Sequence, residues 1–394
     1  MQHYHYLIVG GGMTADAAVQ GIREVDQHGP IGLVSAESDP PYERPPLTKG
    51  LWKDKPFESI WRKTQQYGAQ LHLGRSVQKL DIWRRQVTDH QGDHYTFEKL
   101  LLATGGRPRQ LPFGDNCILY YRTAADYRRL RTMANNGRRF AVLGGGFIGS
   151  EIAAALAMNG KDVLMLFPGP GIGARVYPPE LSEFLTRFYR EKGVEVMPGE
   201  TAMTLTRRGE RLLLKTIRGR TLEVDGVVAG LGIDPNTDLA EQAGLRVENG
   251  IVVDEFLRTS HPHIYAAGDV AAFYNPALRQ RLRVEHEDNA NTMGRLAGRN
   301  IAGNESRYDH LPFFYSDLFE LGYEAVGRID SRLPAVADWQ EPFRQGVIYY
   351  HRDGQVQGVL LWNVYGQVEA ARHLIAGHHQ FQPRELNAAL LKAA

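Results

Sequence analysis

Two glycine-rich turns in this chain have the residue types and spacing of dinucleotide-binding loops. Both fit the pattern G-x-G-x-x-G/A, the first at Gly10, Gly12 and Ala15 and the second at Gly144, Gly146 and Gly149. Small residues at these positions allow a tight turn from strand to helix and let the backbone approach a pyrophosphate at the helix N-terminus. Each turn follows a short apolar, β-rich run and precedes a helical pattern. The two turns therefore predict two bound dinucleotides.

A carboxylate near the end of the second strand of such a unit can accept both ribose hydroxyls. In the first unit Glu37 stands at this point, just past a strand expected over 31–34. In the second unit Phe167 leads into Pro168-Gly169-Pro170 without an acidic residue. Arg175 lies nearby and could meet a 2′-phosphate, although a surface arginine with no such contact is the more frequent case. The choice between NADH and NADPH is therefore left open by these residues.

The most economical chemistry for two dinucleotides is a bound flavin that accepts hydride from a nicotinamide. Cys117 is the only cysteine, which excludes an internal disulfide and a thiolate metal cluster and leaves Cys117 as a small inert side chain. The histidines form no H-E-x-x-H and lack cysteine partners at zinc spacing, so no metal site is expected. The chain also contains no G-x-S-x-G and no G-x-x-x-x-G-K-[ST] motif, which argues against hydrolases and nucleotide triphosphatases.

The elements that must position the two turns are two β-turn-α-β units. Their strands are expected at 6–9 and 31–34 in the first unit, and at 140–143 and 163–167 in the second. Residues 71–104 alternate between apolar and polar residues, as an antiparallel meander does. After a turn at 234–236, strands at 251–253 and 264–267 are expected to return to the first domain.

These elements predict an α/β protein with two Rossmann-like domains and a C-terminal α+β domain. The expected boundaries are 1–120 with 246–310 for FAD, 121–245 for NAD(P)H, and 311–394 for the third domain. In the third domain, strands at 346–350 and 356–362 precede a helical tail at 384–394. A length of 394 residues suits two or three domains.

The charge balance and the apolar stretches of the chain restrict the classes of partner and the location that are expected. Lysine and arginine total 46 against 45 acidic residues, so no global positive field would attract nucleic acid or anionic lipid. The most apolar stretch, 140–160, is interrupted by Ser150, Glu151 and several glycines, so no membrane span is expected. An apolar run at 6–9 begins too close to Met1 for a signal or transit peptide, which favours a cytoplasmic location.

Three further segments carry a resemblance to a known family. They are Tyr42-Glu43-Arg44-Pro45-Pro46-Leu47-Thr48-Lys49, Ala103-Thr104-Gly105-Gly106-Arg107-Pro108-Arg109 and Ile264-Tyr265-Ala266-Ala267-Gly268-Asp269. With the two turns, they resemble the FAD-dependent pyridine nucleotide-disulfide oxidoreductases of the glutathione-reductase structural class. Segments at 166–168, 283–286, 315–318 and 322–327 resemble the apoptosis-inducing factor side of its apoptosis-inducing factor and ferredoxin reductase branch.

The resemblance implies roles for particular residues. Lys49 is expected near the isoalloxazine and paired with Glu151, and Phe147 is expected to gate the nicotinamide site; these three are the candidate catalytic residues. Arg44 is expected at the phosphate side of FAD and Asp269 at its ribityl chain. The full set expected at the two cofactors is Gly10, Gly12, Ala15, Glu37, Arg44, Lys49, Thr104, Gly105, Arg109, Gly268, Asp269, Glu285, His286, Tyr315, Gly144, Gly146, Phe147, Ile148, Gly149, Glu151 and Gly232.

Some positions depart from the family. Tyr315 stands where the group commonly has a tryptophan over the flavin, and Gly169 replaces an acidic residue of apoptosis-inducing factor. Only Gln340–Gln345 separates Trp339 from the strand at Gly346, so the long insertion of the animal protein is missing and a death-signalling role is not supported. No cysteine lies in the Pro45–Thr48 segment, so electrons are expected to leave directly from the flavin.

The implied activity is transfer of hydride from NAD(P)H, with NADH favoured, to FAD and of electrons on to an external acceptor. Quinone, oxygen, ferredoxin and rubredoxin all stay open as acceptors. One alternative is the ferredoxin or rubredoxin reductase component of an oxygenase system, for which Arg279, Arg281 and Arg283 could supply a basic docking patch. Another is an NADH-responsive redox sensor that switches dimerisation or partner binding. A homodimer is a possible assembly.

Overall fold

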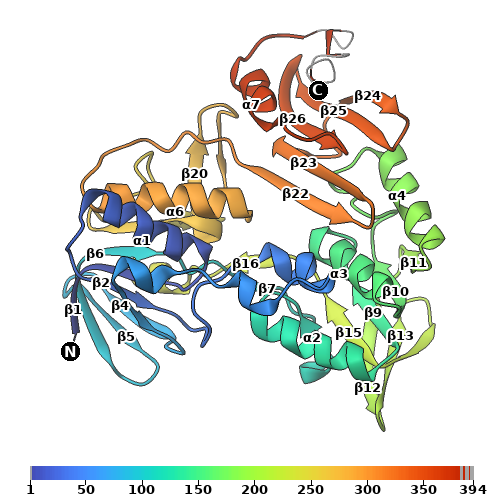
Figure 1. Cartoon of the computed structure of the whole chain (residues 1–394), viewed down its shortest axis with the longest axis horizontal. Helices are drawn as coiled ribbons and strands as arrows, with labels where there is room; N and C mark the ends of the chain where they lie inside the picture. The colour runs from blue at the N-terminus through green and yellow to red at the C-terminus, as the bar shows by residue number, and fades with distance from the viewer. Residues whose placement is uncertain (1, 382–384, 387–389, 391–394) are drawn as a thin grey trace. The chain divides into compact units, whose positions relative to one another are not determined.

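The computed structural model describes residues 2–381, 385–386 and 390. The chain packs into two compact units, the first formed by 1–44, 57–107 and 234–312, and the second by 45–56, 108–233 and 313–394. Figure 1 shows both units coloured along the chain. Each unit draws on three separate stretches of sequence. The division into three domains stays a prediction, because this packing groups the segment 313–394 with the second Rossmann-like sheet.

The first unit is built on a seven-stranded sheet in the order β3-β2-β1-β6-β5-β4, with β19 also paired to β6. Its parallel strands are β1 (Gln2–Val9), β2 (Ile31–Val34), β3 (Ala69–His72), β6 (His94–Leu102) and β19 (Ile264–Ala266). The antiparallel strands β4 (Val77–Asp81) and β5 (Gln86–Asp89) extend it from the start of β6. The predicted antiparallel meander corresponds to β4, β5 and β6. Of the two strands expected to return to this domain, the one at 264–267 joins this sheet as β19, and the one at 251–253 lies in a separate sheet.

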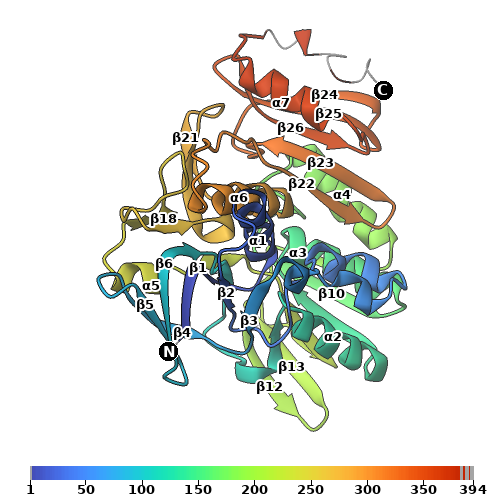
Figure 2. The same ribbon diagram turned by 60° about the vertical axis from the view of Figure 1, so that its left-hand side comes forward.

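Helices α1 (Met13–Val25) and α6 (Glu287–Ile301) lie side by side on this unit, as Figures 1 and 2 show. Glycines make this close approach possible. A Cβ at Gly21 would lie 2.0 Å from the Arg295 carbonyl oxygen, and one at Gly298 would lie 2.1 Å from the Ala18 carbonyl oxygen. Any side chain at either position would push the helices apart. Packing against α6 therefore fixes the position of α1 and of the first glycine-rich turn at its N-terminus.

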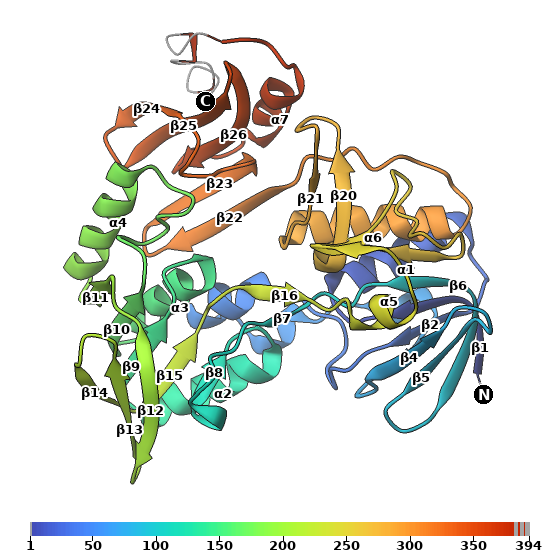
Figure 3. The same ribbon diagram turned by 180° about the vertical axis from the view of Figure 1, so that it is seen from behind.

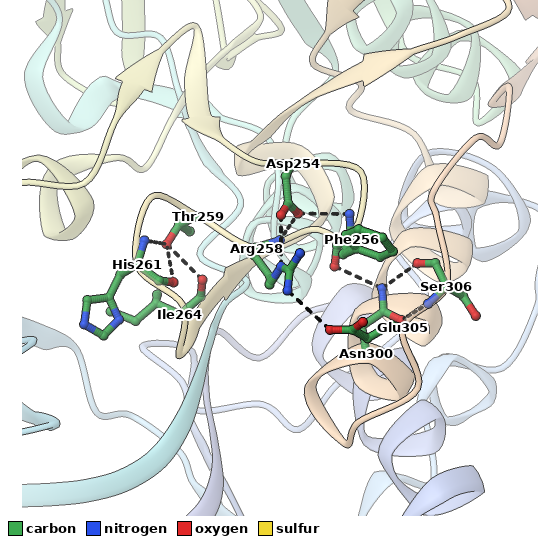
Figure 4. A network of polar contacts seen from close by, with 9 residues as sticks. All are labelled: Asp254, Phe256, Arg258, Thr259, His261, Ile264, Asn300, Glu305 and Ser306. Atoms are coloured by element: carbon green, nitrogen blue, oxygen red, sulfur yellow. Dashed lines mark hydrogen bonds and ion pairs between the residues drawn. The ribbon is translucent and has the colours of Figure 1, made fainter.

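The remaining elements of the first unit are short. They are η3 (Phe57–Ile60), η4 (Thr64–Tyr67), α5 (Asp238–Gln242), β17 (Val247–Glu248), β18 (Gly250–Val252), η6 (Gly268–Val270), β20 (Ala271–Asn275) and β21 (Gln280–Leu282). Between β18 and β19 the chain makes a loop held by polar contacts, drawn in Figure 4. Asp254 accepts from the Arg258 side chain at 2.9 Å, and Asn300 near the end of α6 donates to the Phe256 carbonyl oxygen at 2.9 Å. This network ties the loop to α6.

The second unit contains a five-stranded parallel sheet in the order β11-β10-β9-β15-β8. The strands are β11 (Glu195–Pro198), β10 (Asp162–Phe167), β9 (Arg139–Leu143), β15 (Gly226–Ala229) and β8 (Ile118–Tyr120). Its helices are α2 (Ala124–Asn136), α3 (Phe147–Met158) and α4 (Pro179–Glu191). Strand β8 ends at the predicted boundary of residue 120 but belongs to this sheet, because it pairs with β15 more than 100 residues later in the chain.

Short elements complete this part of the chain. They are η1 (Pro45–Thr48), η2 (Gly50–Trp52), η5 (Asp115–Cys117), and the antiparallel sheet of β12 (Ala202–Arg208), β13 (Arg211–Thr216) and β14 (Thr221–Val224). The paired strands β7 (Gly106–Pro108) and β16 (Ile233–Pro235) lie where the chain passes from one unit to the other.

The C-terminal segment of the second unit is an antiparallel sheet in the order β22-β23-β26-β25-β24, visible from behind in Figure 3. Its strands are β22 (Phe313–Leu318), β23 (Leu321–Gly327), β24 (Ala335–Glu341), β25 (Gln345–Arg352) and β26 (Gln355–Trp362). The predicted strands at 346–350 and 356–362 are confirmed. Helix α7 (Val368–Ala376) was not predicted, and the predicted helical tail at 384–394 lies largely outside the described residues.

Candidate cofactor and electron-transfer site

The first glycine-rich turn has the shape that a pyrophosphate requires. Gly10 has φ +132°, and a Cβ there would lie 2.1 Å from the Ala103 carbonyl oxygen, so only glycine fits. Gly12 is the N-cap of α1 and offers no side chain to its first turn. A Cβ at Gly12 would have the Arg44 guanidinium, 3.9 Å away, as its nearest neighbour. A helix N-terminus, open space and a nearby cation together fit an anion such as the phosphates of FAD.

Arg44 and Glu37 form a cluster in the first unit. Glu37 accepts from Arg44 through one carboxylate oxygen and from the Tyr42 hydroxyl at 2.6 Å through the other. Burial lowers the pKa of the Arg44 guanidinium, but the charges of Glu37 and Asp269 outweigh it and raise that pKa above its ordinary value. Arg44 is therefore a fixed cation close to the start of α1. The predicted contacts of Glu37 with ribose and of Arg44 with phosphate stay predictions.

Arg62 is a residue that the sequence reasoning missed. Its guanidinium donates to the buried Asp16 carboxylate at 3.1 Å, to the Asn291 side chain at 2.7 Å, and lies 2.9 Å from the Glu43 carboxylate. It thus joins the first turn of α1, the residue before Arg44, and α6. Asp16 in the first turn of the predicted helix was the available signal, but nothing in the sequence pairs it with Arg62.

Asp269 and its neighbours lie near this turn. Gly268 has φ +78°, and a Cβ there would lie 2.2 Å from the Thr14 hydroxyl on α1. Close packing of η6 on α1 therefore brings Asp269 beside the predicted pyrophosphate site. At the end of β6, the Thr104 hydroxyl donates to the Asn236 carbonyl oxygen at 2.8 Å, and Asn236 donates back to the Thr104 carbonyl oxygen at 2.8 Å. This clamp fixes Thr104 and the adjoining Gly105.

The arginines expected to form a docking patch are mostly engaged inside the first unit. Arg281 donates to the main-chain oxygens of Val253 and Ala272, at 3.2 and 2.8 Å. Arg283 is 8% exposed and pairs with Glu285 at 2.6 Å, next to His286, the N-cap of α6. Part of the donor capacity of Arg281 and Arg283 therefore serves neighbouring strands and loops, and the basic docking patch stays a prediction. Arg279 and Arg281 are both exposed.

The second glycine-rich turn repeats the geometry of the first. Gly144 has φ +117°, and a Cβ there would lie 2.3 Å from the Gly230 carbonyl oxygen. A Cβ at Gly149 would lie 2.1 Å from the Gly144 carbonyl oxygen. Gly146, the N-cap of α3, has nothing within 4 Å of a Cβ. Two positions thus require glycine for packing and the middle one faces open space, which fits the phosphates of a second dinucleotide.

Residues beside this turn include Phe147 and Ile148, which begin α3. The Phe147 ring lies 5.3 Å from the ring of Phe314 on β22, and Ile148 is 39% exposed. At the far end of β15, the Arg109 amide donates to the Gly232 carbonyl oxygen at 3.0 Å. The predicted gating by Phe147 and the cofactor contacts of Arg109, Ile148 and Gly232 stay predictions.

At the end of β10, where the sequence offered no carboxylate for a ribose, the loop after β11 brings a carboxylate close. Glu200 is 2% exposed, and its amide donates to the Phe167 carbonyl oxygen at 3.1 Å. Its carboxylate accepts from the Arg218 amide at 3.3 Å. Arg175 is exposed on the loop after β10. Glu200 was not predicted because it reaches this edge through sheet pairing rather than through sequence position.

A buried carboxylate, Glu151 on α3, lies in the second unit, and its exposed fraction is 4%. One carboxylate oxygen accepts from the Lys49 ammonium at 2.7 Å and from the Ser316 hydroxyl at 2.6 Å. The other accepts from the Thr48 hydroxyl at 2.5 Å. Such full pairing is what a buried carboxylate needs, since an unpaired one is very costly. The pairing of Lys49 with Glu151 was expected, whereas Thr48 and Ser316 were missed.

Aromatic side chains surround this ion pair. Lys49 is 12% exposed, and its ammonium lies 5.1 Å from the centre of the Tyr315 ring. Burial, with the negative charge of Glu151 as a smaller cause, raises the pKa of Tyr177, Tyr189 and Tyr323 above the ordinary tyrosine value. These hydroxyls are therefore neutral, and the Lys49 ammonium is the cation that compensates Glu151. A fixed positive charge in such a poorly hydrated site acts strongly on nearby negative charge.

Metal-ligand clusters and membrane-spanning helices are not found among the described residues. Within that part of the chain no three histidine, cysteine or acidic side chains gather as metal ligands. None of the helices described there combines the length and apolar character needed to cross a bilayer. The Cys117 sulfur is half-buried and lies 3.9 Å from the Arg207 guanidinium.

Comparisons with known proteins agree with this site. A family model described as pyridine nucleotide-disulphide oxidoreductase matches residues 4–294, and one described as the C-terminal part of mitochondrion-associated apoptosis-inducing factor matches residues 297–342 and 337–377. The chain is 35% identical to apoptosis-inducing factor 1 of Dictyostelium discoideum, over 95% of this chain and 79% of that protein. It is 34% identical to the ferredoxin–NAD(+) reductase component of the anthranilate 1,2-dioxygenase system of Burkholderia cepacia, over 97% of this chain and 96% of that protein.

A solved structure, the covalent complex of putidaredoxin reductase with putidaredoxin, contains a chain that superposes with a TM-score of 0.92 at 29% identity, covering 100% of this chain and 99% of that one. The matched residues include both glycine-rich turns and the Lys49–Glu151 pair. The chain therefore belongs to the pyridine nucleotide-disulphide oxidoreductase family, in its apoptosis-inducing factor and ferredoxin reductase branch, and is an FAD-dependent NAD(P)H oxidoreductase.

Proposed function

We propose that this chain takes electrons from NADH and passes them through FAD to a separate acceptor without using a thiol. The observation that carries this proposal is the buried pair of Lys49 with Glu151, which lies on α3 just after the second glycine-rich turn. Flavin, when bound, supplies the exchange of two electrons with a nicotinamide and their release to an acceptor. The described residues contribute binding, orientation and electrostatics.

Each part of the site has a distinct task in this proposal. The turn at Gly10 and Gly12, with Arg44 beside it, binds the FAD pyrophosphate, and the turn at Gly144–Gly149 binds the pyrophosphate of the nicotinamide nucleotide. Lys49, held by Glu151, presents a fixed positive charge that favours electron density on the flavin. Phe147 covers the nicotinamide site until the donor arrives. Lys49 and Glu151 exchange no proton with a substrate in this scheme.

NADH is the proposed donor. The name of the Burkholderia cepacia relative specifies NAD(+), which supports this choice. The buried Glu200 at the end of β10 also supports it, since a carboxylate at this edge disfavours a 2′-phosphate. Arg175, on the neighbouring loop, is the residue that would favour NADPH instead.

An iron-sulfur protein is the acceptor that the relatives favour. Both the anthranilate dioxygenase component and putidaredoxin reductase are named for, or solved with, such a partner. Quinone and oxygen remain the competing acceptors. The cytoplasmic location and the homodimer expected from the sequence stay predictions.

The experiment is anaerobic stopped-flow absorbance of the flavin-loaded protein mixed separately with NADH and NADPH. The reduced protein is then offered a [2Fe-2S] ferredoxin, a soluble quinone and oxygen in separate syringes. We expect flavin bleaching with NADH well before NADPH and the fastest re-oxidation by ferredoxin. Absence of bleaching with both nucleotides would refute the proposal. Fast bleaching followed by a long-lived charge-transfer band and a change of oligomeric state would favour the redox sensor.

A further inference from the structure

We propose that Ser316 is a positioning residue that keeps Glu151 ionised and oriented toward Lys49, while Thr48 can serve Glu151 in either protonation state. This inference rests on the proposed function only in taking the Lys49 charge to act on the flavin. It assigns a task to two side chains outside the glycine-rich turns. Neither touches the reacting atoms in this scheme; both act through Glu151.

The hydrogen bonds at Glu151 distinguish an ionised from a protonated carboxyl. An ionised carboxylate only accepts, and an ammonium only donates. The oxygen nearest to Lys49 already has two donors, the ammonium at 2.7 Å and the Ser316 hydroxyl at 2.6 Å. A proton on that oxygen would face two donors. The Ser316 contact is therefore strongest with the ionised form, and its distance is the short one typical of charge-assisted hydrogen bonds.

The second oxygen has a different environment. The Thr48 hydroxyl lies 2.5 Å from it and also 3.3 Å from the Pro45 carbonyl oxygen. Thr48 can therefore donate to an ionised Glu151. If Glu151 took up a proton on this oxygen, Thr48 could accept it in a hydrogen bond and turn its own proton toward Pro45. Thr48 has an acceptor in both cases, so its hydroxyl discriminates weakly between the two states.

Other groups that face Glu151 do not replace Ser316. Lys49 comes from the segment between η1 and η2, and Tyr177, Tyr189 and Tyr323 come from the loop before α4, from α4 and from β23. The Tyr189 hydroxyl donates to the Ser150 carbonyl oxygen at 3.0 Å. Tyr323 lies opposite Ser316 in the ladder of β22 and β23, but its hydroxyl makes no hydrogen bond of normal geometry among the described residues. Ser316 is thus the neutral donor on the Lys49 side of the carboxylate.

Strand β22 acts on Lys49 through two consecutive residues. Tyr315 places its ring 5.1 Å from the Lys49 ammonium, and Ser316 bonds the carboxylate that holds the same ammonium. The C-terminal sheet therefore determines how firmly Lys49 is fixed, although Lys49 belongs to a segment more than 250 residues earlier. A change that moves β22 is therefore expected to shift the midpoint potential of the bound flavin.

The test compares Ser316→Ala and Thr48→Val with the wild type, Thr48→Ser as the variant that keeps the hydroxyl, and Ser182→Ala as a control. Ser182 is also buried in the second unit, but its hydroxyl bonds the Ile172 carbonyl oxygen at 2.8 Å. The midpoint potential of bound flavin and the rate of its reduction by NADH are measured from pH 5.5 to pH 8.5. Both readouts depend on charge and would not follow from a merely structural role.

In Ser316→Ala we expect an acid limb in both profiles, because Glu151 should bind a proton roughly tenfold more readily after losing a charge-assisted hydrogen bond. Thr48→Val should shift the profile less, and Thr48→Ser and Ser182→Ala should match the wild type. Profiles of Ser316→Ala that coincide with the wild type would overturn the proposal. A larger shift in Thr48→Val than in Ser316→Ala would overturn the division of tasks between them.

A second measurement separates this inference from the proposed function. The stability of the same variants toward urea is measured across pH without added nucleotide. Because the lost hydrogen bond is stronger when Glu151 is ionised than when its second oxygen carries a proton, the destabilisation by Ser316→Ala should shrink as pH falls. If NADH fails to reduce the wild type while this trend is present, the proposed function fails and the role of Ser316 stands. A destabilisation independent of pH would refute the role of Ser316 whatever the flavin does.

Discussion

Replacing Glu151 by glutamine tests the central ion pair most directly. The substitution keeps the size of the side chain and removes its charge, so Lys49 loses its counter-charge at a site where the two side chains are 12% and 4% exposed. Removing one partner of a buried pair costs about 3–5 kcal/mol. Glutamine retains one acceptor oxygen for Lys49 or Ser316, and Thr48 can turn its proton to Pro45. We therefore expect the lower end, about 3 kcal/mol.

The assay is urea unfolding of the flavin-loaded protein, followed by tryptophan fluorescence at pH 7.5, with the midpoint compared at unchanged slope. Glu320→Gln is the matched control, because the Lys192–Glu320 pair has the same 2.7 Å separation in the same unit but side chains that are 35% and 54% exposed. An exposed pair contributes about 0–1 kcal/mol. A loss below about 1 kcal/mol for Glu151→Gln would refute the reasoning, because the pair would then behave like an exposed one.

The double variant Lys49→Met, Glu151→Leu separates stability from function. Replacing a buried ion pair by apolar residues of similar size is often neutral. We therefore expect the double variant to recover most of the stability lost in Glu151→Gln while its rate of flavin reduction by NADH stays low. Equal loss of stability in the single and double variants would show that packing, not charge, holds this site.

Three further predictions concern binding and pH. Gly10→Ala should abolish FAD retention, because its Cβ would lie 2.1 Å from a main-chain oxygen. Gly146→Ala has space for its Cβ, so this variant should fold normally and raise the Kd for NADH; both effects are measured by spectral titration. Arg62→Ala should release FAD on gel filtration while Arg279→Ala, an exposed control, retains it, because Arg62 alone joins α1, Glu43 and α6. Backbone hydrogen bonds lower the pKa of Asp26 to about 2. The wild type should therefore lose stability relative to Asp26→Asn as pH falls from about 4 to about 2, and equal dependence of unfolding free energy on pH in the two proteins would contradict this.

The glycine-rich turns could be predicted because the spacing of their small residues is a local pattern. The positive φ at Gly10 and Gly144 belongs to that turn, whereas the main-chain oxygens that a Cβ would meet come from the distant residues Ala103 and Gly230. Strands at 31–34, 140–143 and 356–362 were likewise visible from apolar runs. Local pattern was therefore enough for the two dinucleotide units, whereas the sheet of β12, β13 and β14 was not predicted.

Hydrogen-bond partners that lie far apart in the sequence could not be predicted from local sequence pattern. Thr48 and Ser316 lie 103 and 165 residues from Glu151, and neither belongs to a charged or glycine-rich motif. Arg62 reaches Asn291 across 229 residues. The alternation of Arg279, Arg281 and Arg283 likewise does not reveal that the last two also donate to main-chain oxygens of the first unit. Composition shows that a charge is present but not which main-chain oxygens it serves.

Glu151 shows why the predicted pair was correct but incomplete. Resemblance supplies the two charged residues, since a lysine and a glutamate can be matched by position. A buried carboxylate, however, has more acceptor capacity than one ammonium can fill, and leaving it unfilled costs free energy. The need for further donors could therefore be inferred once Glu151 was placed on a buried helix. Which residues meet that need depends on β22 approaching α3, and only the three-dimensional structure supplies that approach.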